Sequence, residues 1–329
     1  MKLSRLGEFG LIKEIQRITY AGRGVRIGIG DDAAWVDNPT GSSLITADLL
    51  IEGVHFNLKW TSMFDLGYKS LAVNLSDIAA MGGIPAYAIF SLGIPTHLDS
   101  RQILAFYRGV ATLAKPSGVS LVGGDTNVAK LLTISVCVIG HAPYAPVRRS
   151  TARVGDDIYV TGTLGDAALG LTVLRRDKQA LRRTAVRQVL ARHHRPTPRL
   201  NAGLALARWK LVTAMIDISD GLLQDLGHIC ESSGIGARVQ NDKLPLSKAY
   251  RILAGNAGTR YALSGGEDYE LLFCARPRNR ARILKLARIA KVPMTRIGTC
   301  VPALRGVKIV NQLGHPLRVR KKGHDHFIK

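Results

Sequence analysis

Short apolar runs separated by glycine-rich turns recur along the first half of the chain and alternate with segments of helical period. Apolar runs bounded by turn residues are typical of buried strands, whereas apolar positions three and four residues apart indicate amphipathic helices. The pattern predicts strands near residues 26–29, 43–47, 86–91, 119–122 and 131–139, and helices over 63–81 and 100–114.

The same alternation starts again after a stretch, HAPYAPVRRS, that carries two prolines and a change in charge. We therefore predict a domain boundary near residue 145, with an N-terminal domain over 1–145 and a C-terminal domain over 146–329. The second half predicts strands over 157–162, 211–219, 269–275 and 295–300, and helices over 165–176, 180–192, 199–208, 220–233 and 278–290. Strands that alternate with helices indicate the α/β class.

Length and composition place the chain among two-domain cytoplasmic proteins. With 329 residues, of which 46% are hydrophobic, it can fill two cores. The longest apolar stretches, such as LLTISVCVIG, are too short to cross a bilayer. The N-terminal stretch has charges and no apolar core of a secretory signal. The four cysteines lie far apart, which favours buried thiols in a reducing compartment.

The charge balance is unusual, because 46 Lys and Arg residues stand against 24 Asp and Glu, a net charge of +22. Much of the arginine lies in two stretches of helical period, and we interpret it as a solvated helix face. Nucleic-acid binding is disfavoured because no aromatic-rich RNA motif accompanies the charge. Attraction of anionic substrates remains a second interpretation.

The stretch IGIGDDAAWV contains a weak nucleotide-binding signal. Gly28, Gly30 and Ala33 fit the spacing of a dinucleotide-binding fingerprint, so a Rossmann oxidoreductase remains open at this point. Asp31 and Asp32, however, stand where a pyrophosphate would meet backbone amides, and two carboxylates would repel it.

Many of the few acidic residues lie at the ends of apolar strands or beside glycines. Taken singly, each has a local explanation, since Asp220 could cap a helix and Asp125 could close a turn. Taken together in so basic a chain, they indicate a shared ligand, and Mg²⁺ prefers oxygen ligands supplied by carboxylates and substrate phosphates. The acids concerned are Asp31, Asp32, Asp48, Asp77, Asp125, Asp217, Asp220, Glu267 and Asp268.

Several catalytic motifs are absent from the sequence. It contains no P-loop, no protein-kinase catalytic loop, no serine-hydrolase elbow and no zinc-protease helix motif. These absences exclude the corresponding enzyme classes.

The motifs as an ordered set resemble thiamine-monophosphate kinase. They are GEFGLI, GIGDDAA, TADLLIEGVHF, KSLAVNLSDIAAMGG, LVGGDT, YVTGTLGDAALGL, RHHRPTPRL, IDISDGLLQDLGHI, LSGGEDYELLF and KGHDHF. The resemblance covers nearly the whole chain. It implies the two-domain α/β fold shared with aminoimidazole ribonucleotide synthetase, in which the N-terminal sheet pairs with its twin in a homodimer. It also implies direct, Mg²⁺-dependent phosphoryl transfer from ATP to thiamine phosphate, which gives thiamine diphosphate and ADP.

The resemblance also implies roles for individual residues. Eight positions correspond to sites that hold several Mg²⁺ ions: Asp32, Thr46, Ala47, Asp48, Asp77, Asp125, Asp217 and Asp220. ATP contacts fall on Tyr107, Gly124, Asp125, Arg149 and Ser219, and substrate contacts on His55, Glu267 and Lys321. Ala47 replaces a usual threonine, and Lys321 stands where the family often has an aromatic residue. We interpret His193 and His194 as structural residues.

Two kinds of alternative remain. Related enzymes of the same fold include selenophosphate synthetase, which would need a reactive cysteine near the N-terminus, whereas the first cysteine here is Cys137. A hydrogenase-maturation dehydratase would need a C-terminal cysteine, and the sequence ends in HDHFIK. A basic nucleic-acid-binding protein with an inactive kinase fold is the alternative from another class.

Overall fold

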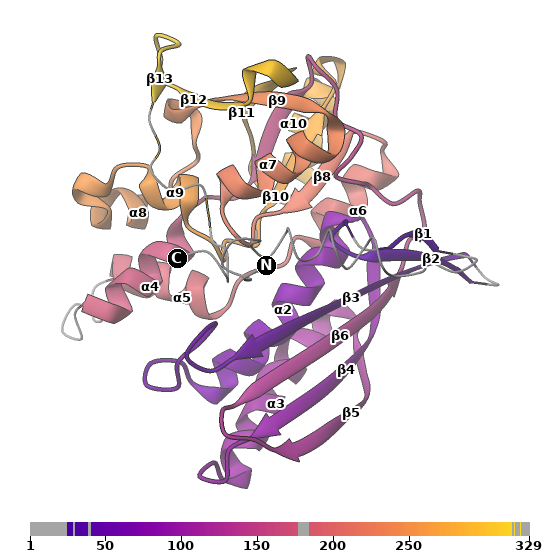
Figure 1. Ribbon diagram of the computed structural model, residues 1–329, viewed down its shortest axis with the longest axis vertical. Coiled ribbons are helices and arrows are strands. Elements are labelled where there is room, and N and C mark those ends of the chain that lie inside the picture. Colours follow the sequence, from indigo (N-terminus) through magenta and orange to yellow (C-terminus); the bar gives the residue numbers. More distant parts are fainter. Residues whose placement is uncertain are drawn as a thin grey trace, which may run out of the picture.

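The computed structural model describes residues 25–28, 30–38, 41–176, 184–317, 319 and 323. Lys321, the GEFGLI motif and most of the KGHDHF motif lie outside the described residues, as do 180–183 of one predicted helix. The described chain forms two sheets, each covered by helices, with the indigo-to-magenta N-terminal part below the orange-to-yellow C-terminal part (Figure 1).

The N-terminal sheet has six strands in the order β1-β2-β3-β6-β4-β5. Its strands are β1 (Val25–Ile27), β2 (Ala34–Asn38), β3 (Gly41–Ile51), β4 (Ile84–Ile94), β5 (Ser120–Val128) and β6 (Thr133–His141). Neighbouring strands are antiparallel except β4 and β5, which run parallel. That parallel pair requires a crossover, and the helix between the two strands supplies it.

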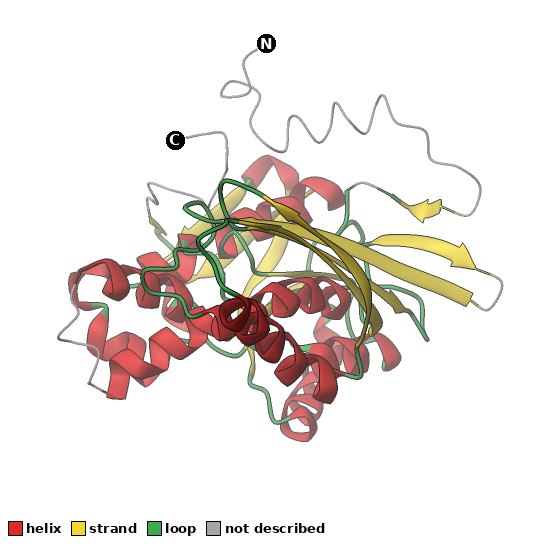
Figure 2. Cartoon of the chain, turned by 90° about the horizontal axis from the view of Figure 1, so that it is seen from below, coloured by secondary structure: helices red, strands yellow, loops and turns green. Residues whose placement is uncertain are grey.

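Two helices, α2 (Met63–Ala80) and α3 (Ser100–Ser117), cover one face of this sheet (Figure 2). Ser62 begins α2 by accepting a hydrogen bond from the Asp65 amide, and Asp99 and Gln102 form a capping box at the start of α3. Gly118 ends α3 with a positive φ of 69°, a conformation that glycine adopts without strain. The caps therefore fix where each helix begins and ends.

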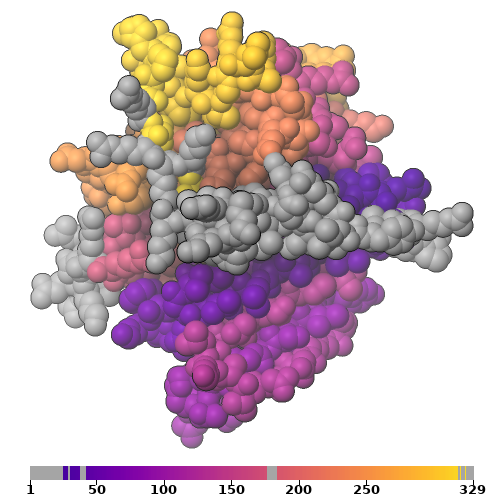
Figure 3. All heavy atoms as spheres, in the orientation of Figure 1, coloured from indigo at the N-terminus to yellow at the C-terminus, as the bar shows by residue number. Residues whose placement is uncertain are grey.

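The opposite face of the N-terminal sheet is covered by no described helix (Figure 1). Leu49 on β3 and Tyr87 and Ile89 on β4 are exposed there, and every residue of β5 is exposed. Figure 3 shows this face in the lower half of the molecule. An exposed apolar sheet face of this kind is typical of an interaction surface.

The C-terminal sheet has seven strands in the order β13-β12-β9-β11-β7-β10-β8. They are β7 (Asp157–Thr161), β8 (Ala214–Asp217), β9 (Ile235–Gln240), β10 (Leu271–Ala275), β11 (Met294–Pro302), β12 (Val307–Val310) and β13 (Pro316–Leu317). Only β12 and β9 pair in parallel. Strands β7, β8 and β10 are buried along their whole length because helices cover both faces.

The helices of this domain are α4 (Asp166–Arg176), α5 (Thr184–His194), α6 (Leu200–Arg208), α7 (Leu222–Ser233), α8 (Lys248–Leu253), α9 (Arg260–Ser264) and α10 (Arg280–Ala290). Short 3₁₀ turns cover Asn241–Lys243, Gly255–Ala257, Pro277–Asn279 and Ala303–Arg305. No helix of the described chain is long and apolar enough to cross a membrane.

Helix α2 connects the two domains, because it packs on the N-terminal sheet and also contacts α6 and β8. Ala79 and Ala80 at its end belong to the same buried cluster as Met215 and Phe273 of the C-terminal sheet. At Gly203 of α6, a β-carbon would lie 2.0 Å from the Ala79 carbonyl oxygen, so only glycine permits this approach. The polar residues of α2 are thereby brought against the C-terminal domain.

The sequence predictions of class and element order are confirmed in outline. The fold is mixed α/β, and each predicted strand and helix overlaps an observed one. The Rossmann interpretation is wrong, because the GIGDDA turn leads into the antiparallel strand β2 and not into a helix. All four cysteines are free thiols, and Cys230, Cys274 and Cys300 are buried.

Candidate active site

Three carboxylates from three separate elements meet where the two domains join. Asp32 lies in the turn between β1 and β2, Asp77 on α2, and Asp217 at the end of β8. One oxygen of each lies within 4.8 Å of the others. Carboxylates at this separation repel one another unless a proton or a cation lies between them.

Neighbouring hydroxyl groups fix the orientation of two of these acids. Thr46 of β3 donates from Oγ1 to Asp77 Oδ2 at 2.5 Å, and Ser76 donates from Oγ to Asp217 Oδ2 at 2.6 Å. Among the described residues, Asp32 Oδ2 is buried without a hydrogen-bond partner. The cluster therefore contains a buried carboxylate oxygen that can still accept a hydrogen bond or bind a cation.

Burial and mutual repulsion raise the pKa values of these acids. The pKa of Asp77 is raised well above its ordinary value by burial, then by the charges of Asp48, Asp217 and Asp32. Burial and the charge of Asp217 raise the pKa of Asp48 to about 6. The pKa of Asp32 is also raised by burial, although the charge of Arg149 opposes the shift. A divalent cation would compete with protons for such a cluster.

Arg149 supplies a positive charge inside this group of acids. Its Nη2 lies 3.0 Å from Asp32 Oδ1 and its Nε 3.3 Å from Asp31 Oδ1. Its backbone amide donates to Asp31 Oδ2 at 3.3 Å. The segment between the two domains thus places a guanidinium, the preferred protein partner of phosphate oxygens, beside the acid cluster.

A second group of possible metal ligands follows directly in sequence. Asp220, Asp225 and His228 each place one ligand atom within 4.8 Å of the others. Asp225 Oδ2 accepts a hydrogen bond from the amide of Gly221, whose φ of 123° allows the sharp turn from β8 into α7. The charges of Asp220 and Asp217 raise the pKa of Asp225 after burial, which shows that the two groups are electrostatic neighbours.

The GGEDYE loop before β10 packs directly on the 217–221 turn. The amides of Glu267 and Tyr269 donate to the carbonyl oxygens of Ser219 and Ile218 at 2.7 and 2.8 Å. Glu267 and Tyr269 have positive φ values of 71° and 48°, conformations that cost L-residues on the order of 1 kcal/mol each. Strain held in this way by surrounding contacts is a common property of binding loops.

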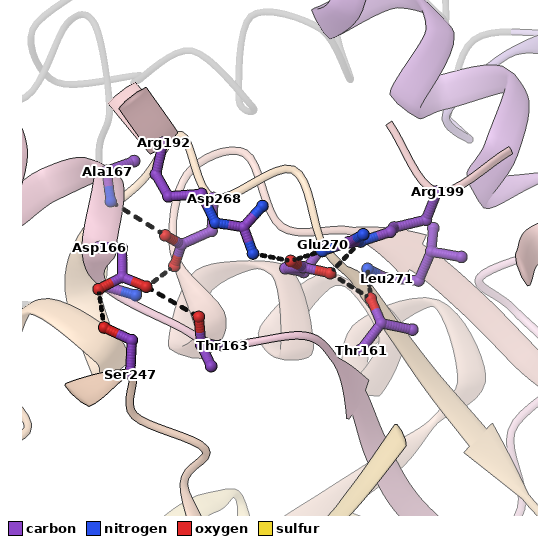
Figure 4. Close-up of polar contacts among 11 residues, drawn as sticks. Thr161, Thr163, Asp166, Ala167, Arg192, Arg199, Ser247, Asp268, Glu270 and Leu271 are labelled. Carbon is purple, nitrogen blue, oxygen red and sulfur yellow. Dashed lines mark hydrogen bonds and ion pairs between the residues drawn. The ribbon is translucent and has the colours of Figure 1, made fainter. Parts of the chain in front are cut away.

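Alternate residues of this loop face in opposite directions. Asp268 and Glu270 point into the C-terminal domain (Figure 4). Asp268 accepts hydrogen bonds from the amides of Gly165 and Ala167 at the start of α4. Glu270 accepts from Thr161, Arg192 and Arg199. These contacts hold the loop against the C-terminal domain.

Glu267 faces the N-terminal domain instead. Lys69 of α2 donates from Nζ to its Oε1 at 2.6 Å, and Nδ1 of His193 on α5 lies 3.0 Å from its Oε2. Burial would raise the pKa of Glu267, but the charge of Lys69 and the contact with His193 outweigh that effect and lower it. The carboxylate is therefore ionised at neutral pH.

The structure brings some of the predicted site residues together and leaves others apart. Nine of them lie at the domain junction and are joined by the contacts described above: Asp32, Thr46, Asp48, Asp77, Arg149, Asp217, Ser219, Asp220 and Glu267. His55 lies in the turn after β3, where its Nδ1 accepts from the Ile51 amide at 2.9 Å and fixes the ring. Lys321 lies outside the described residues.

Tyr107, Gly124 and Asp125 lie elsewhere, around the edge strand β5. Gly124 pairs with Phe90, and the Tyr107 ring contacts the Phe90 ring edge-on. In register, Asp48 and Gly124 are three strand spacings apart, or roughly 14 Å. Asp125 is exposed, in register with Leu49 on the uncovered sheet face. Within one chain these residues are therefore not part of the acid cluster.

Ala47, between Thr46 and Asp48, is exposed on that same uncovered face. Its neighbours point toward α2, because side chains alternate along a strand. The methyl group of Ala47 consequently points away from the acids, and only its backbone can lie beside them.

Sequence reasoning missed several residues that the structure places at the junction. They are Lys69, Ser76, Asp225 and His228. Lys69 and Ser76 are seven residues apart, two helical turns, and so share one face of α2. The lysine seven residues before Ser76 in the helical stretch YKSLAVNLSDIAAM was the signal that could have identified this face.

The arrangement defines a class of protein. The chain matches the family model for the AIR synthase related protein N-terminal domain over residues 30–142 and that for its C-terminal domain over 153–311. The chain therefore belongs to the AIR synthase related family, in which the matched domains correspond to the two sheets described above.

Closer relatives narrow the assignment to the thiamine-monophosphate kinases. The chain is 42% identical over 325 residues to the thiamine-monophosphate kinase of Salmonella typhimurium, covering 98% of each chain. It is 35% identical to that of Bacillus subtilis, covering 98% of this chain and 100% of the relative. It is also similar to the solved structure of AaThiL complexed with AMPPCP and TMP, with 34% identity, 99% coverage of both chains and a TM-score of 0.87.

Proposed function

We propose that this protein transfers the γ-phosphoryl group of ATP directly to thiamine phosphate, giving thiamine diphosphate and ADP. The observation that carries the proposal is the cluster of Asp32, Asp77 and Asp217 at the domain junction. It is supported by full-length similarity to thiamine-monophosphate kinases and to a relative complexed with AMPPCP and TMP. The reaction uses cytoplasmic ATP.

The reaction requires no general base from the protein. Thiamine phosphate is a phosphate monoester that is largely ionised near neutral pH, so its oxygen is already a nucleophile. The remaining difficulty is the repulsion between two anions, and phosphoryl transfer is catalysed chiefly by positioning and charge stabilisation. Arg149, which contacts Asp32 of the acid cluster, and Ser219 would contact the phosphates of ATP.

The acid cluster fits Mg²⁺. Its ligands are hard carboxylate oxygens, their pKa values are raised, and one buried oxygen of Asp32 has no hydrogen-bond partner among the described residues. Asp32, Asp77 and Asp217 would hold one ion, with Thr46, the Ala47 backbone, Asp48 and Asp220 as further ligands of a group of ions. Bound Mg²⁺ supplies charge neutralisation on the transferring phosphates.

Glu267 and His55 would contact the thiamine part of the acceptor, together with Lys321. Glu267 is the ionised carboxylate of the site that faces the domain junction, and the thiazolium ring of thiamine carries a positive charge. Opposite charges at a partly buried site attract strongly enough to orient the acceptor.

The uncovered face of the N-terminal sheet fits a second copy of the chain. Leu49, Tyr87 and Ile89 give it an apolar surface, and it continues along the exposed edge strand β5. Pairing across this face would bury Asp125, which lies on it in register with Leu49. Of the predicted ATP contacts apart from the acid cluster, Asp125 is the one that the homodimer would bring to an interface. Sedimentation of wild type and of Leu49→Lys tests the pairing, with a monomer expected for the variant.

The direct test of function is incubation of the pure protein with ATP, Mg²⁺ and thiamine phosphate. Thiamine diphosphate and ADP should form in equal amounts. Asp32→Asn and Asp220→Asn should each lower turnover at least tenfold at limiting Mg²⁺ while the protein remains folded. No product from the wild type, combined with tight, salt-dependent binding to RNA, would favour the nucleic-acid alternative.

A further inference from the structure

Lys69 and His193 converge on one carboxylate from two different domains. Lys69 comes from α2 in the N-terminal domain, and its Nζ lies 2.6 Å from Glu267 Oε1. His193 comes from α5 in the C-terminal domain, and its Nδ1 lies 3.0 Å from Glu267 Oε2. Each oxygen of the carboxylate therefore has its own protein neighbour, and the hydrogen bond from Lys69 fixes the position of Oε1.

The three side chains differ in exposure. Those of Lys69 and His193 are only 5% and 4% exposed, whereas that of Glu267 is 26% exposed. The lysine and histidine thus lie behind the carboxylate, and Glu267 alone of the three reaches solvent. A bound molecule would meet Glu267 and would not meet the two residues that hold it.

The charges of this group are asymmetric. Burial and the nearby charge of Lys69 lower the pKa of His193, so its ring is uncharged at neutral pH. Lys69 consequently supplies the positive charge that keeps Glu267 ionised, and His193 supplies a geometric restraint. A glutamate held in one rotamer loses less conformational entropy when it binds a ligand.

The backbone beneath Glu267 is constrained as well. A β-carbon at Gly266 would lie 2.3 Å from the Ser219 carbonyl oxygen, so the loop approaches the 217–221 turn more closely than other residues allow. Two turns along α2 from Lys69, Ser76 holds Asp217. One face of α2 therefore orients both the Glu267 carboxylate, through Lys69, and Asp217 of the acid cluster, through Ser76.

We propose that Lys69 and His193 are positioning residues that hold the Glu267 carboxylate ready for the thiamine part of the acceptor. The inference rests on the proposed function, since it assigns to Glu267 the contact with thiamine phosphate. It makes acceptor binding depend on the contact between the two domains, and it leaves ATP binding to other residues.

Kinetics and calorimetry with thiamine phosphate test this proposal. Lys69→Met should raise both KM and the dissociation constant for thiamine phosphate at least tenfold, with KM for ATP changed less than twofold. The exposed residue Lys115 of α3 provides the matched control, and Lys115→Met should leave both KM values unchanged. Equal effects of Lys69→Met on the two substrates would overturn the proposal.

A double-mutant cycle separates positioning from a general structural role. If Lys69 acts through Glu267, Lys69→Met should have less than a twofold further effect in a Glu267→Gln background. Multiplicative effects would contradict this. His193→Leu should weaken acceptor binding, and His193→Asn should restore much of it, because the asparagine amide can take the place of Nδ1.

A measurement without substrate distinguishes failure of this proposal from failure of the proposed function. Carbon NMR of the glutamate carboxyl groups in the full-length protein should show a higher pKa for Glu267 in Lys69→Met than in wild type. An unchanged pKa would overturn the positioning role even in an active enzyme. Wild type that binds no thiamine phosphate would instead refute the proposed function, and with it the assigned role of Glu267.

Discussion

Two groups of buried acids in this protein differ in how their charge is compensated. Asp157 and Glu270 each contact arginine side chains. Asp32, Asp77 and Asp217 contact one another, with Arg149 as the cation nearest to them. In a chain with a net charge of +22, arginines for further pairing are abundant. The difference indicates that the first group stabilises the fold and the second is arranged for a cation that is not part of the chain.

The largest expected effect comes from a substitution at Asp217, which tests whether this acid binds a cation or stabilises the fold. Asp217→Asn should lower the turnover of thiamine phosphate at least a thousandfold, equivalent to about 4 kcal/mol of transition-state stabilisation. The metal-free protein should be as stable as wild type or more stable, because a repelling charge is removed. Steady-state kinetics and urea unfolding in EDTA measure the two quantities. If Asp217→Asn lost stability but kept a turnover near that of wild type, Asp217 would belong with the acids that stabilise the fold.

Glu270 should behave in the opposite way. It is 1% exposed and accepts hydrogen bonds from Arg192 and Arg199, so Glu270→Gln leaves buried positive charge uncompensated. We expect a loss of about 3 kcal/mol in the free energy of unfolding, measured with urea. Asp37→Asn is the matched control, since Asp37 pairs with the exposed Arg26 and its loss should change stability by less than about 1 kcal/mol.

The pH dependence of stability gives a third test. The pKa of Asp48 is raised from 3.8 to about 6, so the folded protein holds this proton more tightly than the unfolded chain. Its contribution to stability is therefore complete below pH 3.8 and is lost as the pH rises through about 6. In EDTA, the stability of Asp48→Asn relative to wild type should increase by about 2 kcal/mol between pH 4 and pH 7. A constant difference across this range would contradict the raised pKa.

The smallest effect is expected at the surface of the same interdomain region. Arg195 contacts Asp65, and its guanidinium lies 4.9 Å from the centre of the Phe64 ring, but the side chain is 50% exposed. Solvent weakens both interactions, so Arg195→Ala should cost less than about 1 kcal/mol. Thermal unfolding and kinetics measure the effect. A loss in the free energy of unfolding comparable to that of Glu270→Gln would show that side-chain exposure does not predict the strength of these interactions.

The fold could be predicted well where the sequence carries a local signal. Apolar runs bounded by turn residues identified β3, β4, β6, β7 and β10, and apolar positions of helical period identified α2 and α3. Strands β2, β9, β12 and β13 were missed, and only the tertiary structure reveals that β9 and β12 pair in parallel. Long-range pairing of this kind leaves little trace in local periodicity.

The candidate site was predictable in its acids and not in their partners. Asp32 and Asp217 stood out because few acids occur in the chain and both lie at the ends of apolar strands, and Asp77 stood out because it belongs to the motif KSLAVNLSDIAAMGG. Lys69 did not, because a buried lysine in an apolar helix has a meaning only once Glu267, 198 residues away, is known to face it. The sequence also could not show that Asp125 lies on the opposite face of the sheet from Asp48.

Direct titration of a divalent cation into the metal-free protein tests the central claim, that Asp32, Asp77 and Asp217 are gathered to hold such an ion. Mn²⁺ binding followed by calorimetry should be saturable for wild type and for Asp37→Asn, and at least tenfold weaker for Asp217→Asn. Equal affinity of wild type and Asp217→Asn for Mn²⁺ would contradict the account.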